Sequence, residues 1–156
     1  MQRDKIGADL RDLAFDFFYW FSRFEYALKA CGYLVNKAVG ARAEPNWDLF
    51  ASQHRATYIL SDASRRLIEL APEKQVVAAG GDLEFVPLDF SQVTTDLEKV
   101  VLCAKTVRNN LFHGGKHGSD FWDDPARMTE LLTITLVVLR ELSGLGGLRD
   151  DFERLY

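Results

Sequence analysis

Apolar residues recur at intervals of three and four near the start of the chain, which is the spacing of one helix face. The residues concerned are Leu10, Leu13, Ala14, Phe17, Phe18, Phe21, Phe24, Leu28 and Cys31. We predict one long helix that ends near Gly32 or Gly40. Between Leu13 and Phe21 it is apolar nearly all round, because Phe15, Tyr19 and Trp20 cover its back. Such a helix is buried on every side, in a core or against a second chain.

Two shorter helices and one irregular stretch are expected next. Pro45 and the residues after it predict a short second helix. The spacing predicts a third from about Tyr58 to Leu70, with Ser61–Asp62 as a break or restart. The stretch from Val76 to Asp89 has a glycine pair between short β-prone runs. It predicts either a small hairpin or an ordered loop.

The second half of the chain predicts two long helices and a short tail. Ser91 is expected to cap the first of them, and Gly114–Gly115 to end it. Asp123 or Asp124, followed by Pro125, opens the second. This second helix is the most apolar of all, so we expect it at the centre of the core. The amphipathic tail consists of Leu148, Phe152 and Leu155.

The composition agrees with one globular domain. The chain has 156 residues, of which 47% are hydrophobic and 27% charged, and it shows no repeat or linker. We therefore predict a single all-α domain over residues 1–156. It is a bundle of about five helices with a short irregular or hairpin insertion near residues 76–89.

Several classes of protein are disfavoured by what the sequence lacks. The polar N-terminus does not resemble a signal peptide, and charges interrupt the longest apolar stretches, so we expect no membrane segment. Cys31 and Cys103 lie in apolar helical patterns without CxxC spacing, which indicates core thiols in a reducing compartment. The expectation is a cytoplasmic protein with no metal site and no cofactor.

The charges are unevenly distributed. The whole chain has a net charge of −4, yet from Lys99 to Ser119 there are four basic residues and no acid, which leaves −8 on the rest. A basic site in an acidic body suits an anionic ligand bound at one place. A chance run of solvated lysines explains the same window and stays open as an alternative.

Two charges fall on apolar stripes. Arg108 is eleven residues from Leu97, which puts both on one helix face to within about 20°. Glu25 lies between Phe21 and Leu28 on the stripe of the first helix. Burying either charge alone is costly, so each needs a partner. One interpretation is a Glu25–Arg108 pair that sets the helix register; the other is a cleft where both meet an anion or a second subunit.

His113 is the last residue before the glycine pair, at the predicted end of its helix. On an ideal helix it lies about 140° from Arg108, but we expect the helix to unwind here so that the ring swings back. A histidine beside an arginine suits proton transfer at a phosphate. The alternative is a simple helix-end contact. The proton-transfer interpretation rests on the basic and polar residues nearby, namely Arg108, Asn109, Lys116 and His117.

The run Arg108-Asn109-Asn110-Leu111-Phe112-His113 resembles the RxxxxH motif of HEPN domains, and Gly114-Gly115-Lys116 continues as in many members. The stretch from Phe21 to Lys29 also resembles HEPN first helices. The resemblance implies a HEPN-like bundle that forms a symmetric dimer, with two motifs facing one cleft. Catalytic members are metal-independent endoribonucleases of toxin–antitoxin, phage-defence and RNA-processing systems.

By this resemblance, Arg108 stabilises the pentacoordinate phosphorane, His113 is the general acid or base, and Asn109 orients the phosphate or the ring. We expect Lys105, Lys116 and His117 to bind the RNA substrate and Glu25 to support the site. Members regulated by a nucleotidyltransferase often carry a tyrosine after the histidine, whereas this chain has Gly114-Gly115-Lys116-His117, so any antitoxin is a separate protein with another mode of action. Two alternatives stay open: a noncatalytic RNA- or protein-binding module, and a purely structural Arg108–Glu25 pair.

Overall fold

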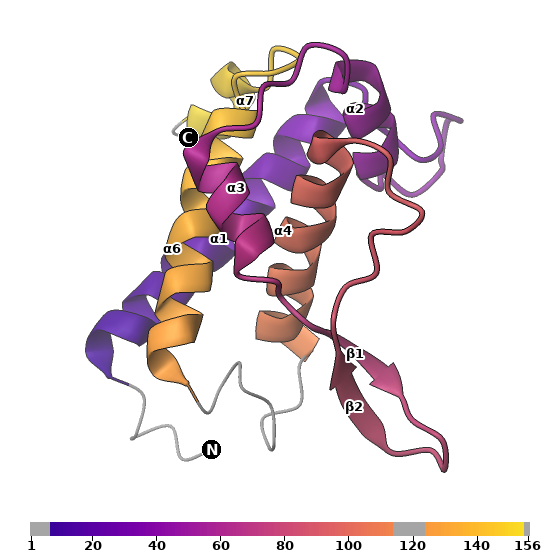
Figure 1. Ribbon diagram of the computed structural model, residues 1–156. Coiled ribbons are helices and arrows are strands. Elements are labelled where there is room, and N and C mark those ends of the chain that lie inside the picture. The colour runs from indigo at the N-terminus through magenta and orange to yellow at the C-terminus, as the bar shows by residue number, and fades with distance from the viewer. Residues whose placement is uncertain (1–6, 114–123, 155–156) are drawn as a thin grey trace.

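The computed structural model describes residues 7–113 and 124–154, and within these ranges the chain forms a helical bundle with one small sheet (Figure 1). The helices are α1 (Ala8–Ala30), α2 (Trp47–His54), α3 (Asp62–Glu69), α4 (Asp96–His113), α6 (Pro125–Leu142) and α7 (Arg149–Glu153). The strands are β1 (Lys74–Val77) and β2 (Leu83–Val86). The prediction of a helical bundle is confirmed, and the described part has six helices where about five were expected.

One core joins the long helices. α1 packs against α6 and α7, while α3 packs across α4 and α6, and α2 covers the first half of α4 (Figure 1). The apolar stripes read from the sequence face mainly inward, with Phe17, Phe24, Val100, Leu132 and Leu139 fully buried, although Phe18 and Phe112 are exposed. α6, the helix expected at the centre of the core, has seven buried residues and α4 has eight, so the core is shared between these helices rather than centred on α6.

Helix starts follow local hydrogen bonding, and one predicted start is wrong. α4 begins after Thr95, not Ser91: the amide of Glu98 donates to Thr95 Oγ1 at 3.3 Å and the amide of Thr95 donates to Glu98 Oε2 at 3.0 Å. This reciprocal capping box satisfies two amides that the helix leaves unpaired. Ser91 is instead bound to Asp89, through its amide at 2.8 Å and its hydroxyl at 2.9 Å.

Two other starts agree with the sequence. Asp124 accepts hydrogen bonds from the amides of Ala126 and Arg127, both at 3.0 Å, with Pro125 in the first turn of α6. Ser61 caps α3, so of the two readings of Ser61–Asp62 the restart is right. No helix forms between Tyr58 and Leu60.

The irregular stretch is a β-hairpin. β1 and β2 pair antiparallel, from Lys74 opposite Val86 to Val77 opposite Leu83. Gly80 and Gly81 have φ values of +109° and +95° in the turn, a region that glycine enters without steric cost. The hairpin projects beyond the C-terminal end of α4 (Figure 1), and of the two forms expected for the insertion near residues 76–89 the hairpin is right.

α1 is buried on one side only. Phe17, Phe21 and Phe24 are at most 2% exposed, but Phe15 is 66% and Phe18 48% exposed. The prediction of burial on every side is therefore wrong within this single chain. Among the described residues, no helix is long and apolar enough to cross a membrane.

Candidate functional site

Arg108 and Glu25 form an ion pair between α4 and α1. Arg108 Nη2 lies 3.6 Å from Glu25 Oε2, and their side chains are 34% and 24% exposed. Trp47 of α2 donates from Nε1 to the other carboxylate oxygen of Glu25 at 3.4 Å. The predicted pair thus exists, at the edge of the core and in reach of solvent.

Aromatic rings hold the Arg108 guanidinium from two directions. Its central carbon is 5.8 Å from the centroid of Phe21 and 5.6 Å from that of Phe112, within the range of cation–π attraction. Nη1 also donates to Asn109 Oδ1 at 3.0 Å. A guanidinium has five N–H donors, so these contacts leave donors for an anion.

Arg108 lines a small cavity between α1 and α4. The cavity has a volume of about 120 Å³ and is bordered by Phe18, Phe21, Ser22, Glu25, Arg108 and Phe112. Two of the bordering residues, Phe18 and Phe112, belong to a set of exposed aromatic side chains. This set, here called the aromatic face, consists of Phe15, Phe18 and Tyr19 of α1 and Phe112 of α4. The rings of Phe18 and Phe112 are 5.6 Å apart, so the face continues from α1 to the end of α4.

His113 lies in a different cavity. α4 is helical as far as His113, so Arg108 and His113 lie about 140° apart around one helix, and the unwinding expected at Gly114–Gly115 lies outside the described residues. His113 borders a cavity of about 300 Å³ between α4 and β1, with Lys74, Gln75, Thr106, Asn109 and Asn110. Asn109 connects the Arg108 cavity with the His113 cavity, since it borders the latter and also accepts a hydrogen bond from Arg108.

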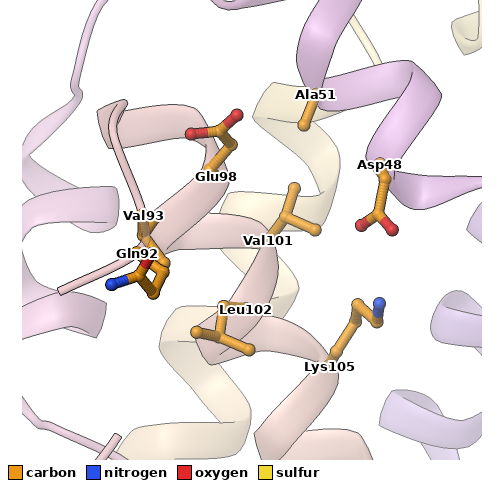
Figure 2. Close-up of a pocket in the computed structure, with 8 residues that line it drawn as sticks. All are labelled: Asp48, Ala51, Gln92, Val93, Glu98, Val101, Leu102 and Lys105. Atoms are coloured by element: carbon orange, nitrogen blue, oxygen red, sulfur yellow. The ribbon is translucent and has the colours of Figure 1, made fainter. Parts of the chain in front are cut away.

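Lys105 is in neither of these cavities. It borders a third one, of about 240 Å³, between α2, α4 and the loop before α4. Figure 2 shows its ammonium group pointing toward the carboxylate of Asp48. The structure therefore does not bring Lys105 together with Arg108 or His113. Lys116 and His117 lie outside the described residues.

The Glu98 carboxylate on the rim of the Lys105 cavity is engaged in the helix cap (Figure 2). Desolvation raises its pKa, but hydrogen bonds from Thr95 and Thr94 outweigh this and leave the pKa below its ordinary value. Glu98 is thus an ionised structural group rather than a proton donor.

Neither cysteine forms a disulfide. Both thiols are free; Cys103 is buried in the core, and this burial raises its pKa to about 12. Cys31 is half-buried beside Asp151 and the carbonyl of Gly147, and burial followed by the charge of Asp151 raises its pKa. Both are poor nucleophiles at neutral pH. In the part of the chain that the structure describes, no three His, Cys, Asp or Glu residues gather as a metal site.

Sequence reasoning missed several residues around Arg108 and His113. Trp47 and Phe112 were visible only as apolar residues of helical stripes, and Lys74 and Gln75 only as residues near an irregular stretch. Their places at the site depend on how α2 and the hairpin pack against α4, which no local pattern encodes. In the sequence, only the motif residues Arg108, Asn109 and His113 indicated that a site lies here.

Comparison with known proteins found no matching family model, no matching curated protein and no matching solved structure. The resemblance to HEPN domains therefore rests on the residues of this chain.

Proposed function

We propose that the protein is a metal-independent endoribonuclease of a toxin–antitoxin or phage-defence type system, active as a symmetric dimer. The observation that carries the proposal is the end of α4, where Arg108 has N–H donors available for an anion and His113 is exposed, next to the exposed aromatic face. A separate antitoxin protein is the expected regulator.

The aromatic face supports the dimer. Large exposed apolar patches are typical of interaction sites, and this one extends along α1 to Phe112, the neighbour of His113. In a dimer with twofold symmetry, each patch packs on its own copy, and residues close to the axis meet their counterparts. Pairing through this face would bring two copies of Arg108 to one cleft and His113 to its border.

The chemistry needs only groups that RNA and this chain supply. The 2′-hydroxyl of RNA attacks the adjacent phosphorus, a base takes its proton, and the 5′-oxygen leaves with a proton from an acid. The products are a 2′,3′-cyclic phosphate and a 5′-hydroxyl end. His113 would transfer protons, and Arg108, oriented by Glu25 and Asn109, would stabilise the charge that develops on the phosphate oxygens.

A noncatalytic RNA- or protein-binding module is the second candidate, and one observation favours it. Arg108 and His113 border separate cavities within one chain, and Glu25 partly neutralises Arg108. Such an arrangement can bind an anion without placing the histidine at its reacting atoms.

Cleavage of a labelled structured RNA in EDTA tests the proposal. The wild-type protein is compared with His113→Ala, Arg108→Ala and the control Arg66→Ala, which removes an exposed arginine paired with Glu130 at 2.6 Å. We expect losses of about 100-fold or more for His113→Ala and Arg108→Ala, little change for Arg66→Ala, and 2′,3′-cyclic phosphate ends.

Each variant is first checked for a wild-type circular dichroism spectrum and melting temperature. Cleavage that persists in His113→Ala would contradict the assigned role of that residue. RNA binding that depends on Arg108, with no cleavage by any variant, would favour the noncatalytic module.

A further inference from the structure

We propose that the cavity between β1 and α4 is a subsite for a single unpaired RNA nucleotide, with Lys74 binding its phosphate and the amide side chains of Gln75 and Asn109 reading its base. This inference rests on the proposed function, because it takes RNA as the substrate. It adds residues of the hairpin, which the motif does not include.

The hairpin is fixed to α4 at the point where it enters the cavity. The buried side chain of Asn110 donates from Nδ2 to the carbonyl oxygen of Glu73 at 2.7 Å. The next two residues along the chain are Lys74 and Gln75, and both border the cavity. Their backbone is therefore held against α4, which is what a binding site needs for defined geometry.

The side chains around this cavity suit a nucleotide. Gln75 carries a carboxamide with donors and an acceptor, and Asn109, whose Oδ1 accepts from Arg108, offers the N–H donors of its Nδ2; carboxamides are the groups that recognise base edges. Thr106 uses its hydroxyl donor on the carbonyl of Leu102, and Asn110 uses one of its two N–H donors on that of Glu73, so the side-chain oxygens of both remain as acceptors. Among the described residues, the six that border the cavity include no acid, and Lys74 adds a positive charge.

The size of the cavity selects an unpaired nucleotide. Its volume of about 300 Å³ is at the lower end of the range for small-molecule sites, about 300–1,000 Å³, and is too small for a duplex. Sequence-specific proteins read RNA mainly at single-stranded positions, whose bases can turn outward into a protein pocket. The aromatic face near Arg108 is made of aromatic side chains, which have no carboxamide groups to recognise a base edge. We therefore assign base recognition to the cavity beside the hairpin.

The position next to His113 gives this subsite a consequence for cleavage. His113 borders the cavity, so a nucleotide held there neighbours the phosphate on which His113 is proposed to act. The base in the cavity would then influence which phosphate is cleaved. Gln75 becomes a specificity-determining residue and Lys74 a general affinity residue.

Binding of short RNAs tests the inference without depending on cleavage. The probes are fluorescein-labelled 2′-O-methyl octamers of A, C, G and U, which lack the attacking hydroxyl, and the readout is fluorescence anisotropy. The variants are Lys74→Gln and Gln75→Ala. The control is Lys99→Gln, which removes a lysine of α4 that is paired with Asp96 at 3.4 Å and does not border the cavity.

We expect Lys74→Gln to weaken binding of all four octamers by a similar factor, since a phosphate contact carries no sequence information. Gln75→Ala is expected to weaken the preferred octamer by about 5- to 100-fold and to reduce the difference between the four. Lys99→Gln should leave both affinity and preference within about twofold of wild type, the scale of a surface charge change.

The outcomes separate this inference from the proposed function. Wild-type affinity and preference in both hairpin variants would overturn the subsite, even if cleavage still depended on His113. Failure of the wild-type protein to bind any octamer would overturn it as well. Binding that depends on Lys74, without cleavage of natural RNA, would support the subsite and contradict the nuclease. Circular dichroism of Lys74→Gln and Gln75→Ala checks that the changes act on binding; neither residue belongs to the buried core.

Discussion

The two faces of α1 carry similar side chains and have different surroundings. On one face Phe24 packs against Trp47, Phe50 and Phe152, with ring centroids 5.0, 5.9 and 6.0 Å away. On the other, Phe18 has the ring of Phe112 5.6 Å away and is 48% exposed. The sequence pattern is apolar on both faces, so it does not indicate which of them packs into the core.

The bundle needs only one aromatic face of α1 for its core. The second face adds exposed apolar area, which disfavours solubility and gives one chain little stability in return. Such an exposed apolar surface is typical of a site that binds a partner. Arg108 lies at the boundary, between the ring of Phe21 on the buried side and that of Phe112 on the exposed side.

The largest effect is expected from removing a ring of the buried face. Phe24→Ala should lower the free energy of unfolding by about 3–5 kcal/mol, through lost burial and a cavity in the core. Phe18→Ala should cost less than about 1 kcal/mol, because half of the ring is already in solvent. Urea unfolding followed by circular dichroism, at a fixed protein concentration, measures both.

Equal losses for the two variants would contradict the distinction between the faces. The measurement is repeated over a range of protein concentrations. A loss for Phe18→Ala that grows with concentration would belong to the pairing of chains rather than to the fold of one chain.

The exposed face is tested by placing a charge on it. If two copies pair through this face, Phe18→Asp should weaken the dimer by about 30-fold or more, as expected for a central interface aromatic. Sedimentation velocity at micromolar concentration measures the shift toward a 17.7 kDa species. Val39→Asp is the control, because Val39 is a fully exposed apolar residue in the loop after α1.

A wild-type protein that sediments as a clean 17.7 kDa monomer would contradict the dimer. A wild-type dimer that survives Phe18→Asp would place the interface elsewhere on the molecule. Either result would leave the buried face of α1 as described.

The ion pair at the boundary is expected to contribute less. Breaking a buried pair costs about 3–5 kcal/mol, but Arg108 and Glu25 are 34% and 24% exposed and 3.6 Å apart. A double-mutant cycle with Arg108→Gln and Glu25→Gln should give a coupling energy of about 0.5–1 kcal/mol. A coupling of about 3 kcal/mol would instead support a purely structural role for the pair.

Much of this arrangement follows from local patterns. The spacing of apolar residues predicts α1, α4 and α6, and Asp124 followed by Pro125 predicts the start of α6. The pairing of Glu25 with Arg108 was among the expected outcomes, because both charges lie on apolar stripes and each needs a partner.

The remaining differences have identifiable causes. Ser91 fails as a cap because the neighbouring Asp89 binds both its amide and its hydroxyl, a local competition that propensity ignores. Lys105 was grouped with Arg108 by charge and sequence distance, but α2 packs beside it and places it with Asp48. The cavity beside His113 depends on one tertiary hydrogen bond, from Asn110 to Glu73.

The smallest expected effect concerns a polar pair next to the buried face. The hydroxyl of Tyr33 lies 2.7 Å from His54 Nε2, and the His54 ring is 5.1 Å from Phe50, which packs on Phe24. Burial lowers the pKa of His54 below its ordinary value of 6.5, so the fold favours the neutral ring. The unfolded chain then binds more protons as the pH falls, and acid destabilises the fold.

The contribution of His54 is therefore complete above its ordinary pKa of 6.5 and is lost as the pH falls below 6.5 and through the lower pKa of the folded state. We expect the wild-type free energy of unfolding to decline over this window more steeply than that of His54→Gln, which keeps a polar side chain near Tyr33 but does not titrate. Urea unfolding at pH 7.5, 6.5 and 5.5 gives both slopes. Parallel slopes of unfolding free energy against pH would show that protonation of His54 does not act on the core. A steeper wild-type slope, with sedimentation that does not change with pH, would confine the effect to the buried side of α1.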